Sequence, residues 1–125
     1  MAPKKVLIVD DHLDTRVICR ELFTHFGYVV FEAADGTEAL DVAKSRVPDL
    51  ILLDFLMPRG DGLEVLRTLR AHAPLSKTAI VLYTAAATEA EKLLSTEGVQ
   101  RVVFKPSQAS DLLRVVSELI GEAGS

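Results

Sequence analysis

Five short runs of apolar residues, separated by amphipathic stretches, constrain the fold of this chain more than any other feature. The runs are Val6–Val9, Tyr28–Phe31, Leu50–Leu53, Ala79–Tyr83 and Val102–Phe104. Strands that are apolar throughout, rather than alternating with polar residues, are typical of parallel sheets that helices cover on both sides. The pattern therefore predicts an α/β fold, a doubly wound five-stranded parallel sheet with helices on both faces.

The stretches between these runs carry apolar residues at helical spacing. The stripes are Leu13, Val17, Ile18, Leu22 and Phe26; Ala39, Val42, Ala43 and Val47; Gly62, Val65, Leu66 and Leu69; a weaker one from about Ala86 to Glu97; and Leu112, Val116, Leu119 and Ile120. Gly27 stands where the first helix is expected to end. The last helix has a second stripe, Leu113, Val115 and Ile120, which indicates either deeper burial or a surface for a partner.

Length and composition limit the class of protein. A chain of 125 residues suits a single domain, and we expect one over residues 1–125 with an ordered core from about 4 to 121. The net charge of −4, without a basic block, argues against a surface for nucleic acid. Lys4 and Lys5 precede only four apolar residues, unlike a signal peptide, and no run approaches the ~20 residues of a membrane span. We therefore expect a cytoplasmic protein without membrane contact, with the single Cys19 as a buried filler.

Polar side chains stand at the carboxyl ends of four of the five predicted strands. Asp10 and Asp11 follow the first, Asp54 the third, Thr84 the fourth and Lys105 the fifth. In a parallel sheet these ends meet at one edge, which is where ligands bind. Each residue alone has a structural explanation, as a helix cap, a turn residue or a solvated charge. Their common position favours a functional site.

The residue types indicate phosphoryl chemistry. Three neighbouring carboxylates repel one another, and a cluster of oxygen ligands suits Mg²⁺. With a metal bound, a carboxylate oxygen of Asp54 could attack a phosphoryl group, as aspartate nucleophiles do. The Lys105 ammonium would spread the charge of the transferring group, and the Thr84 hydroxyl would donate to one of its oxygens. This role explains why a carboxylate follows a buried strand at Asp54.

Four motifs resemble the receiver domain of two-component response regulators, and the resemblance covers essentially the whole chain. They are VLIVDD (Val6–Asp11), LILLDFLMPRGDG (Leu50–Gly62), VLYTA (Val81–Ala85) and FKP (Phe104–Pro106). The resemblance implies a flavodoxin-like (βα)5 fold with strand order 2-1-3-4-5. It also implies a signalling switch that catalyses only its own phosphoryl transfer and dephosphorylation.

By this resemblance, Asp54 accepts a phosphoryl group from a sensor histidine kinase or a phosphotransfer protein. Asp11, Asp54 and the backbone carbonyl of Leu56 would ligate Mg²⁺, for which Mn²⁺ can substitute, while Asp10 would act mainly through a coordinated water.

The resemblance further makes Thr84 the switch hydroxyl and Lys105 the partner of the phosphoryl oxygens, with a cis peptide before Pro106. Phosphorylation would change the face formed by the fourth helix, the fifth strand and the fifth helix. An output protein or effector domain would bind there, and a homodimer through the same face is an option.

The sequence departs from the family at three positions. Val102 stands where many receivers have Tyr or Phe, although Tyr83 and Phe104 are close in sequence. Leu56 and Ala86, at positions that tune the lifetime of the phosphoryl group, have no polar side chain to orient water. We therefore expect hydrolysis to depend on a partner or on backbone groups.

Three other functions agree less well with these residues. A flavin-binding protein would need a phosphate cradle where this chain has Asp10, Asp11 and Asp14. A phosphatase with an aspartate nucleophile usually has an acid where Leu56 stands. The strongest alternative is a receiver-like interaction module that works without phosphorylation, which Val102 keeps open.

Two further points concern His12 and the end of the chain. His12 is the one histidine placed to affect the pocket, because it follows the acid pair directly. No output domain follows residue 125, so the chain is either a stand-alone receiver or one taken from a longer protein, and the final GEAGS is expected to fray.

Overall fold

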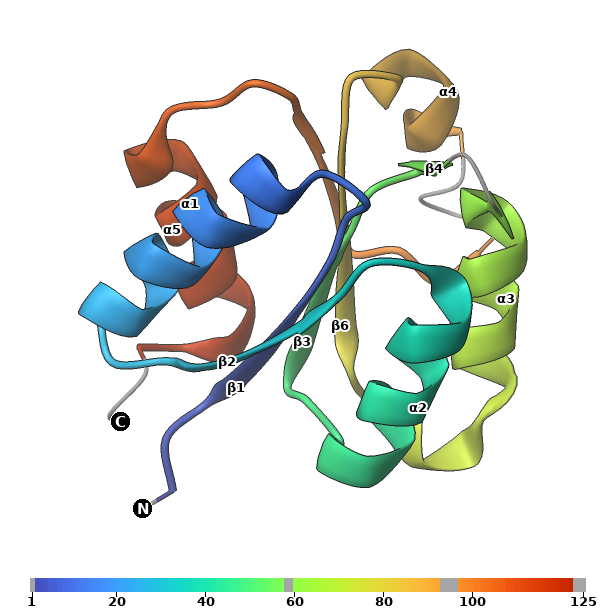
Figure 1. Ribbon diagram of the computed structural model, residues 1–125, viewed down its shortest axis with the longest axis horizontal. Helices are drawn as coiled ribbons and strands as arrows, with labels where there is room; N and C mark the ends of the chain where they lie inside the picture. The colour runs from blue at the N-terminus through green and yellow to red at the C-terminus, as the bar shows by residue number, and fades with distance from the viewer. Residues whose placement is uncertain (1, 58–59, 93–96, 123–125) are drawn as a thin grey trace.

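The computed structural model describes residues 2–57, 60–92 and 97–122, and its centre is a five-stranded parallel sheet (Figure 1). The strands are β1 (Lys5–Val9), β2 (Val29–Ala33), β3 (Leu50–Leu53), β6 (Ala79–Thr84) and β7 (Arg101–Phe104). Their order, β2-β1-β3-β6-β7, confirms the predicted doubly wound topology. A separate antiparallel pair, β4 (Leu56–Met57) and β5 (Gly60–Asp61), follows β3 directly and was not predicted.

Helices cover both faces of the sheet. Helices α1 (Leu13–His25) and α5 (Ala109–Ile120) lie on one side, and α2 (Gly36–Arg46), α3 (Gly62–Ala71) and α4 (Ala87–Glu91) on the other, as Figure 1 shows. A short 3₁₀ turn, η1 (Ala73–Leu75), leads into β6. In the described part of the chain, no helix is long and apolar enough to cross a membrane.

The central strands are apolar throughout because each supplies two hydrophobic cores. Along β1, Val6 and Ile8 join the core under α1 and α5, while Leu7 and Val9 join the core under α2, α3 and α4. Successive side chains of a strand point to opposite faces, so a strand between two helical layers has no polar position.

The second strand lies further along the chain than predicted. The apolar run ended at Phe31, but β2 continues through Glu32 to Ala33, which pairs with Val9. An edge strand tolerates such a charge because one side of it stays open to solvent, and Glu32 pairs there with Arg16 and Arg20 of α1. Tyr28 instead precedes the strand and donates its hydroxyl to the Gly121 carbonyl, 2.7 Å away.

The stripe predicted as the buried face of the first helix is partly wrong. Leu13, Ile18 and Phe26 are 61%, 65% and 53% exposed, whereas Cys19 and Phe23 are the buried residues of α1. The helix carries apolar residues on more than one face, so spacing alone did not identify the face that packs. The burial of Cys19 and the end of the helix before Gly27, whose φ is +92°, agree with the predictions.

Both apolar stripes of the last helix pack inward. Leu112, Val115 and Val116 are buried, and the partly buried Leu113, Leu119 and Ile120 pack against the same core. This arrangement favours deep burial over a separate outward stripe. Of the weaker helix expected from Ala86 to Glu97, the helical part is α4 (Ala87–Glu91), and residues 93–96 lie outside the described residues.

Candidate functional site

The carboxyl ends of β1 and β3 bring two of the predicted acids together. Val9 and Leu53 are partners in the sheet, so Asp10 and Asp54 leave adjacent strands at the same edge. The backbone N–H of Asp54 donates to the Val9 carbonyl at 2.9 Å, and that of Asp10 to the Ala33 carbonyl at 3.1 Å. Asp10 is 1% exposed and Asp54 is 4% exposed. The ladder therefore holds two nearly buried carboxylates in fixed positions.

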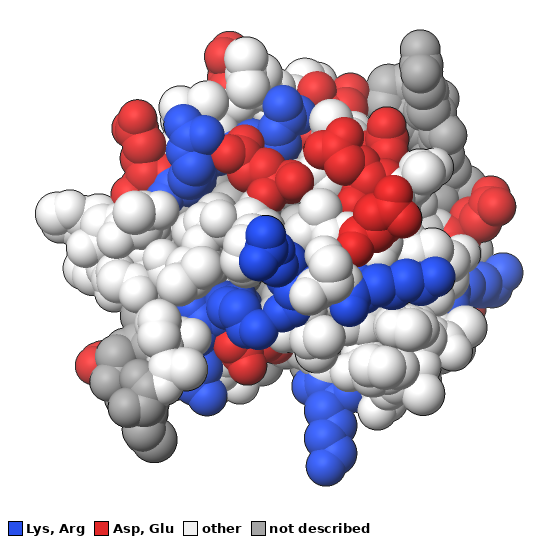
Figure 2. All heavy atoms as spheres, turned by 60° about the horizontal axis from the view of Figure 1, so that its bottom comes forward, with Lys and Arg blue, Asp and Glu red and all other residues white. Residues whose placement is uncertain are grey.

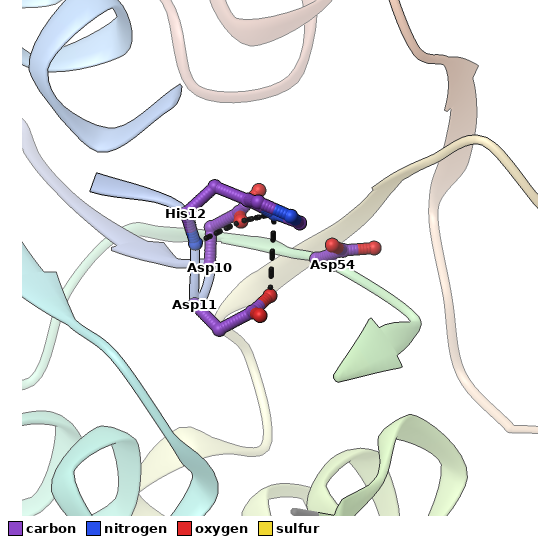
Figure 3. A group of neighbouring side chains, drawn as sticks. All are labelled: Asp10, Asp11, His12 and Asp54. Carbon is purple, nitrogen blue, oxygen red and sulfur yellow. Dashed lines mark hydrogen bonds and ion pairs between the residues drawn. The ribbon is translucent and has the colours of Figure 1, made fainter. Parts of the chain in front are cut away.

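Asp11 and His12 complete a cluster around these acids. One potential ligand atom from each of Asp10, Asp11, His12 and Asp54 lies within 4.8 Å of all the others. Figure 3 shows these side chains converging from the end of β1 and from Asp54 after β3.

The chemistry of this cluster fits a divalent cation. Asp11 Oδ1 is buried and accepts no hydrogen bond, although it lies 3.3 Å from the imidazole Nδ1 of His12. A buried carboxylate oxygen without a donor is costly unless a cation compensates it. Three carboxylates at one point are the ligands that Mg²⁺ and similar hard ions prefer.

Lys105 supplies the positive charge at the site. It directly follows β7, before a cis peptide to Pro106, and its backbone N–H donates to the Thr84 carbonyl at 3.0 Å. Its ammonium Nζ lies 2.5 Å from Asp10 Oδ2 and 3.2 Å from Asp54 Oδ2. Burial alone would lower the pKa of Lys105, but its hydrogen bond to Asp10 and the charges of Asp10 and Asp54 outweigh it and raise the pKa. The Lys105 amine therefore stays protonated and bridges the two buried carboxylates.

Thr84 is the last residue of β6 and is fully buried. Its hydroxyl oxygen accepts a hydrogen bond from the backbone N–H of Ala86, 3.1 Å away, and so holds the loop that leads into α4. Thr84 thus stands at the same edge as the acids, with its hydroxyl engaged in the loop after its own strand.

The backbone after Asp54 is held closely by the start of α3. Leu56 pairs with Asp61 in the β4–β5 pair, which begins at Leu56, one residue beyond Phe55, the residue after Asp54. A Cβ placed on Gly62 would lie 2.2 Å from the carbonyl oxygen of Phe55. Only glycine allows α3 to begin this close to the Phe55 backbone.

Sequence reasoning missed Arg16, which positions the first acid. Its Nη1 donates to the Asp10 carbonyl at 2.8 Å, and its Nε donates to Glu32 Oε1 at 3.2 Å. Arg20 holds the other oxygen of Glu32 at 2.7 Å. Because Arg16 lies on α1 and Glu32 on the edge strand, no spacing along the chain could have indicated this arrangement.

The aromatic residues near the site take opposite sides of the sheet. Phe104 pairs with Thr84, and Val102 pairs with Leu82, so Phe104 and Val102 share the face of Thr84. Phe104 is 56% exposed there. Tyr83 is buried on the opposite face, where its ring centroid lies 5.6 Å from the Lys105 ammonium.

Comparison with known proteins points to one family. The family model described as the response regulator receiver domain matches residues 6–117. The polar-differentiation response regulator DivK of Brucella anthropi is 31% identical over 122 residues, which are 97% of this chain and 99% of that protein. Sporulation initiation phosphotransferase F of Bacillus subtilis is 43% identical over 70 residues, 56% of either chain. The chain spans 48% of a longer relative, the probable transcriptional regulator ycf27 of Cyanophora paradoxa, at 34% identity over 94% of this chain.

Solved structures agree with this assignment. The chemotaxis protein CheY4 of Vibrio cholerae superposes with a TM-score of 0.89 at 30% identity, over 94% of this chain and 99% of that one. The receiver domain of a Pseudomonas aeruginosa sensor histidine kinase, with magnesium in its active-site cleft, gives a TM-score of 0.86 at 27% identity, covering 97% and 100%. The response regulator TrrA of Thermotoga maritima, in complex with Mg²⁺ and BeF, gives 0.82 at 32% identity, covering 93% and 98%. On the sequence match and the shared fold together, this chain belongs to the response regulator receiver domain family.

Proposed function

We propose that this chain is a phosphorylation-dependent signalling switch in which Asp54 accepts a phosphoryl group from a histidine kinase or a phosphotransfer protein. The observation that carries the proposal is the bridge from Lys105 to the buried Asp10 and Asp54. Beside this bridge lies Asp11 Oδ1, a buried oxygen that accepts no hydrogen bond. We further propose that residues 1–125 act as one receiver domain with its core at about 4–121. The cytoplasmic location expected from the sequence stays a prediction.

The proposed metal is Mg²⁺, with Mn²⁺ as a substitute. Asp11 and Asp54 would hold it directly, together with the backbone carbonyl of Leu56, and Asp10 would act through a water. The acid cluster supports this assignment, as do the magnesium-bound relatives. A bound divalent ion would offset the negative charge on the phosphoryl oxygens during transfer.

The transfer itself forms one bond and breaks one. A carboxylate oxygen of Asp54 attacks phosphorus, the new O–P bond forms, and the P–N bond of the phosphohistidine donor breaks with its electron pair left on the imidazole nitrogen. Lys105, already between Asp10 and Asp54, offsets the charge that gathers on the phosphoryl oxygens. The protein transfers the group to itself and loses it by hydrolysis, so it acts as a switch and turns over no other substrate.

Thr84 is the proposed switch residue. Its hydroxyl oxygen accepts from the Ala86 N–H while its O–H can donate to a phosphoryl oxygen, so a movement of Thr84 toward that oxygen would carry the loop that leads into α4 with it. One charge-assisted hydrogen bond contributes about 1.5–3 kcal/mol. Inverting a population from 1:99 to 99:1 requires about 5.5 kcal/mol. We therefore expect phosphorylation to shift the population only partly until a partner binds.

The proposed output surface is the face of α4, β7 and α5. A groove between β7 and α5 is lined by Val102, Phe104, Pro106, Gln108 and Arg114, among others. An output protein or effector domain would bind here, and a homodimer is the second option for the same face. Elsewhere on the molecule, the face that Figure 2 draws carries both acidic and basic side chains. Such mixed charge, with the net charge of −4, is unlike the basic surface that binds nucleic acid directly.

The phosphoryl group is expected to be long-lived. Leu56 and Ala86 provide no polar side chain to orient a water for attack on the acyl phosphate. A partner or backbone groups must therefore assist hydrolysis. Loss of the phosphoryl group within seconds, without any partner, would contradict this part of the proposal.

The test is intact mass spectrometry after incubation with a small-molecule phosphodonor, with and without Mg²⁺. We expect a Mg²⁺-dependent gain of one phosphoryl group in the wild type and in Asp41→Asn, an exposed carboxylate on α2, but not in Asp54→Ala. Mass is the suitable readout because the chain has no Trp, so tryptophan fluorescence cannot report metal binding.

The second candidate function is a receiver-like interaction module that works without phosphorylation. The observation in its favour is Val102, which leaves the face of Thr84 without the usual aromatic residue at that position. If the protein binds Mg²⁺ yet gains no phosphoryl group, this alternative replaces the proposal.

A further inference from the structure

His12 is the one member of the acid cluster to which the proposed function gives no role. Its side chain is 64% exposed, and the imidazole Nδ1 is turned toward the carboxylates of Asp10 and Asp11 (Figure 3). Its Nδ1 is 3.1 Å from Asp10 Oδ1 and 3.3 Å from Asp11 Oδ1. Its backbone N–H also donates to Asp10 Oδ1, at 2.9 Å, which fixes the residue against that carboxylate.

These separations match those between two ligands of one small metal ion. Bonds of about 2.0–2.1 Å place neighbouring ligands about 3.3 Å apart in a tetrahedron and about 2.9 Å apart in an octahedron. The distances from Nδ1 to the two carboxylate oxygens fall in this interval. Lys105 bonds Asp10 through Oδ2, so the ammonium and the imidazole use different oxygens of the same carboxylate.

A mixed set of nitrogen and oxygen ligands discriminates between metals. Mg²⁺ prefers oxygen ligands and retains several waters, so an imidazole adds little to its binding. Zn²⁺ binds imidazole and carboxylate well, most often with four ligands in a tetrahedron.

We propose that His12 Nδ1, with Asp10, Asp11 and Asp54, forms a Zn²⁺ site that overlaps the proposed Mg²⁺ site and competes with it. The inference rests on the metal site of the proposed function, which supplies the three carboxylates. With four protein ligands in a tetrahedron, Zn²⁺ would have no open position for a phosphoryl oxygen. Zn²⁺ would therefore block phosphorylation of Asp54 rather than support it, and the site would make the switch sensitive to this metal.

The experiment is isothermal titration of the whole chain with Zn²⁺ and, separately, with Mg²⁺. It compares the wild type, His12→Ala and the control His25→Ala, which removes an exposed histidine at the end of α1. We expect His12→Ala to weaken Zn²⁺ binding by at least the 10–100-fold that loss of an outer-shell partner costs. Its Mg²⁺ affinity should stay within about twofold of wild type, because oxygen ligands carry that binding, and His25→Ala should change neither.

A second readout identifies the nitrogen involved. In protein labelled with ¹⁵N-histidine, Zn²⁺ should shift the Nδ1 resonance of His12, and Mg²⁺ should leave it in place. Equal Zn²⁺ affinity in wild type and His12→Ala, with Mg²⁺ binding intact, would overturn the inference and leave the proposed function standing. Absence of binding by both metals would overturn the metal site itself, and the inference with it.

Discussion

The contact between Gly62 and the Phe55 backbone gives the sharpest mutational prediction. In Gly62→Ala, the new Cβ would lie 2.2 Å from the Phe55 carbonyl oxygen and 2.7 Å from the Phe55 Cα. Neither atom belongs to a side chain that could rotate away. The Phe55 carbonyl must therefore retreat by about 0.8 Å to reach even a 3.0 Å contact. That carbonyl lies between Asp54, the proposed nucleophile, and Leu56, the proposed third metal ligand.

Two effects oppose each other in the stability of this variant. Overpacking typically costs about 1–3 kcal/mol, while replacing Gly by Ala in a helix gains roughly 0.5–1 kcal/mol. The gain should be at its low end, because Gly62 is the first residue of α3. We expect a net loss of about 1–2 kcal/mol, which for a chain of this size lowers Tm by about 4–8 °C. A displacement approaching 1 Å beside the nucleophile should also slow phosphoryl acceptance, by up to about 100-fold.

The matched control is Gly36→Ala, at the first residue of α2. Its new Cβ would approach a side-chain methyl, Val65 Cγ2, at 2.6 Å, and no backbone atom within 3.4 Å is among its nearest contacts. Val65 lines a groove between α2 and α3, so this contact can be relieved by a shift of one side chain rather than of the backbone. Thermal unfolding and the rate of phosphorylation by a small phosphodonor should therefore separate the two variants. If Gly62→Ala keeps the wild-type Tm and rate, the reasoning from backbone contact is wrong.

Three further predictions concern residues around the site. Arg16→Ala should weaken Mg²⁺ binding by about 10-fold or more, because Arg16 donates a hydrogen bond to the Asp10 carbonyl and loss of such an outer-shell partner has this effect. Titration calorimetry measures the Mg²⁺ affinity. The control is Arg114→Ala, on α5, and equal affinities of the two variants would refute the prediction. Burial raises the pKa of the Cys19 thiol to about 11 from 9.0. The contribution of this buried thiol to the free energy of unfolding is therefore complete below pH 9 and is lost as pH rises to 11. Urea unfolding should show the wild type losing up to about 2.7 kcal/mol more than Cys19→Ala over that range, and parallel pH curves would contradict the assignment. Phe104→Ala should change the free energy of unfolding by no more than about 0.5 kcal/mol, because the side chain is largely exposed. The variant should still accept a phosphoryl group, but the change in hydrogen exchange of β7 on phosphorylation should be smaller than in the wild type. An unchanged response would exclude a role for Phe104 in the switch.

The sequence predicted the sheet well because burial on both faces leaves a strong signal. The strands β3 (Leu50–Leu53) and β6 (Ala79–Thr84) are buried at every position, and Leu50–Leu53 and Ala79–Tyr83 were apparent as uninterrupted apolar runs. The predictions for the edge strand and the first helix were less accurate. Glu32 belongs to β2 through its pairing with Ile8. Helix α1 buries Cys19 and Phe23, whereas its apolar residues Leu13 and Ile18 are exposed.

The sequence by itself determined which polar residues come to one edge of the sheet. Asp10, Asp11, Asp54, Thr84 and Lys105 stand at strand ends, and parallel strands bring their carboxyl ends to one edge whatever the side chains do next. Only the tertiary structure decided what each side chain touches there. A contact between segments far apart in sequence sets the bridge from Lys105 to the two acids. The packing of neighbouring elements sets the hydrogen bond from Arg16 to the Asp10 carbonyl and the close approach of Gly62 to Phe55. Such contacts depend on differences in distance of a few tenths of an ångström. Side-chain packing determines these distances, and the spacing of residues along the chain does not encode them.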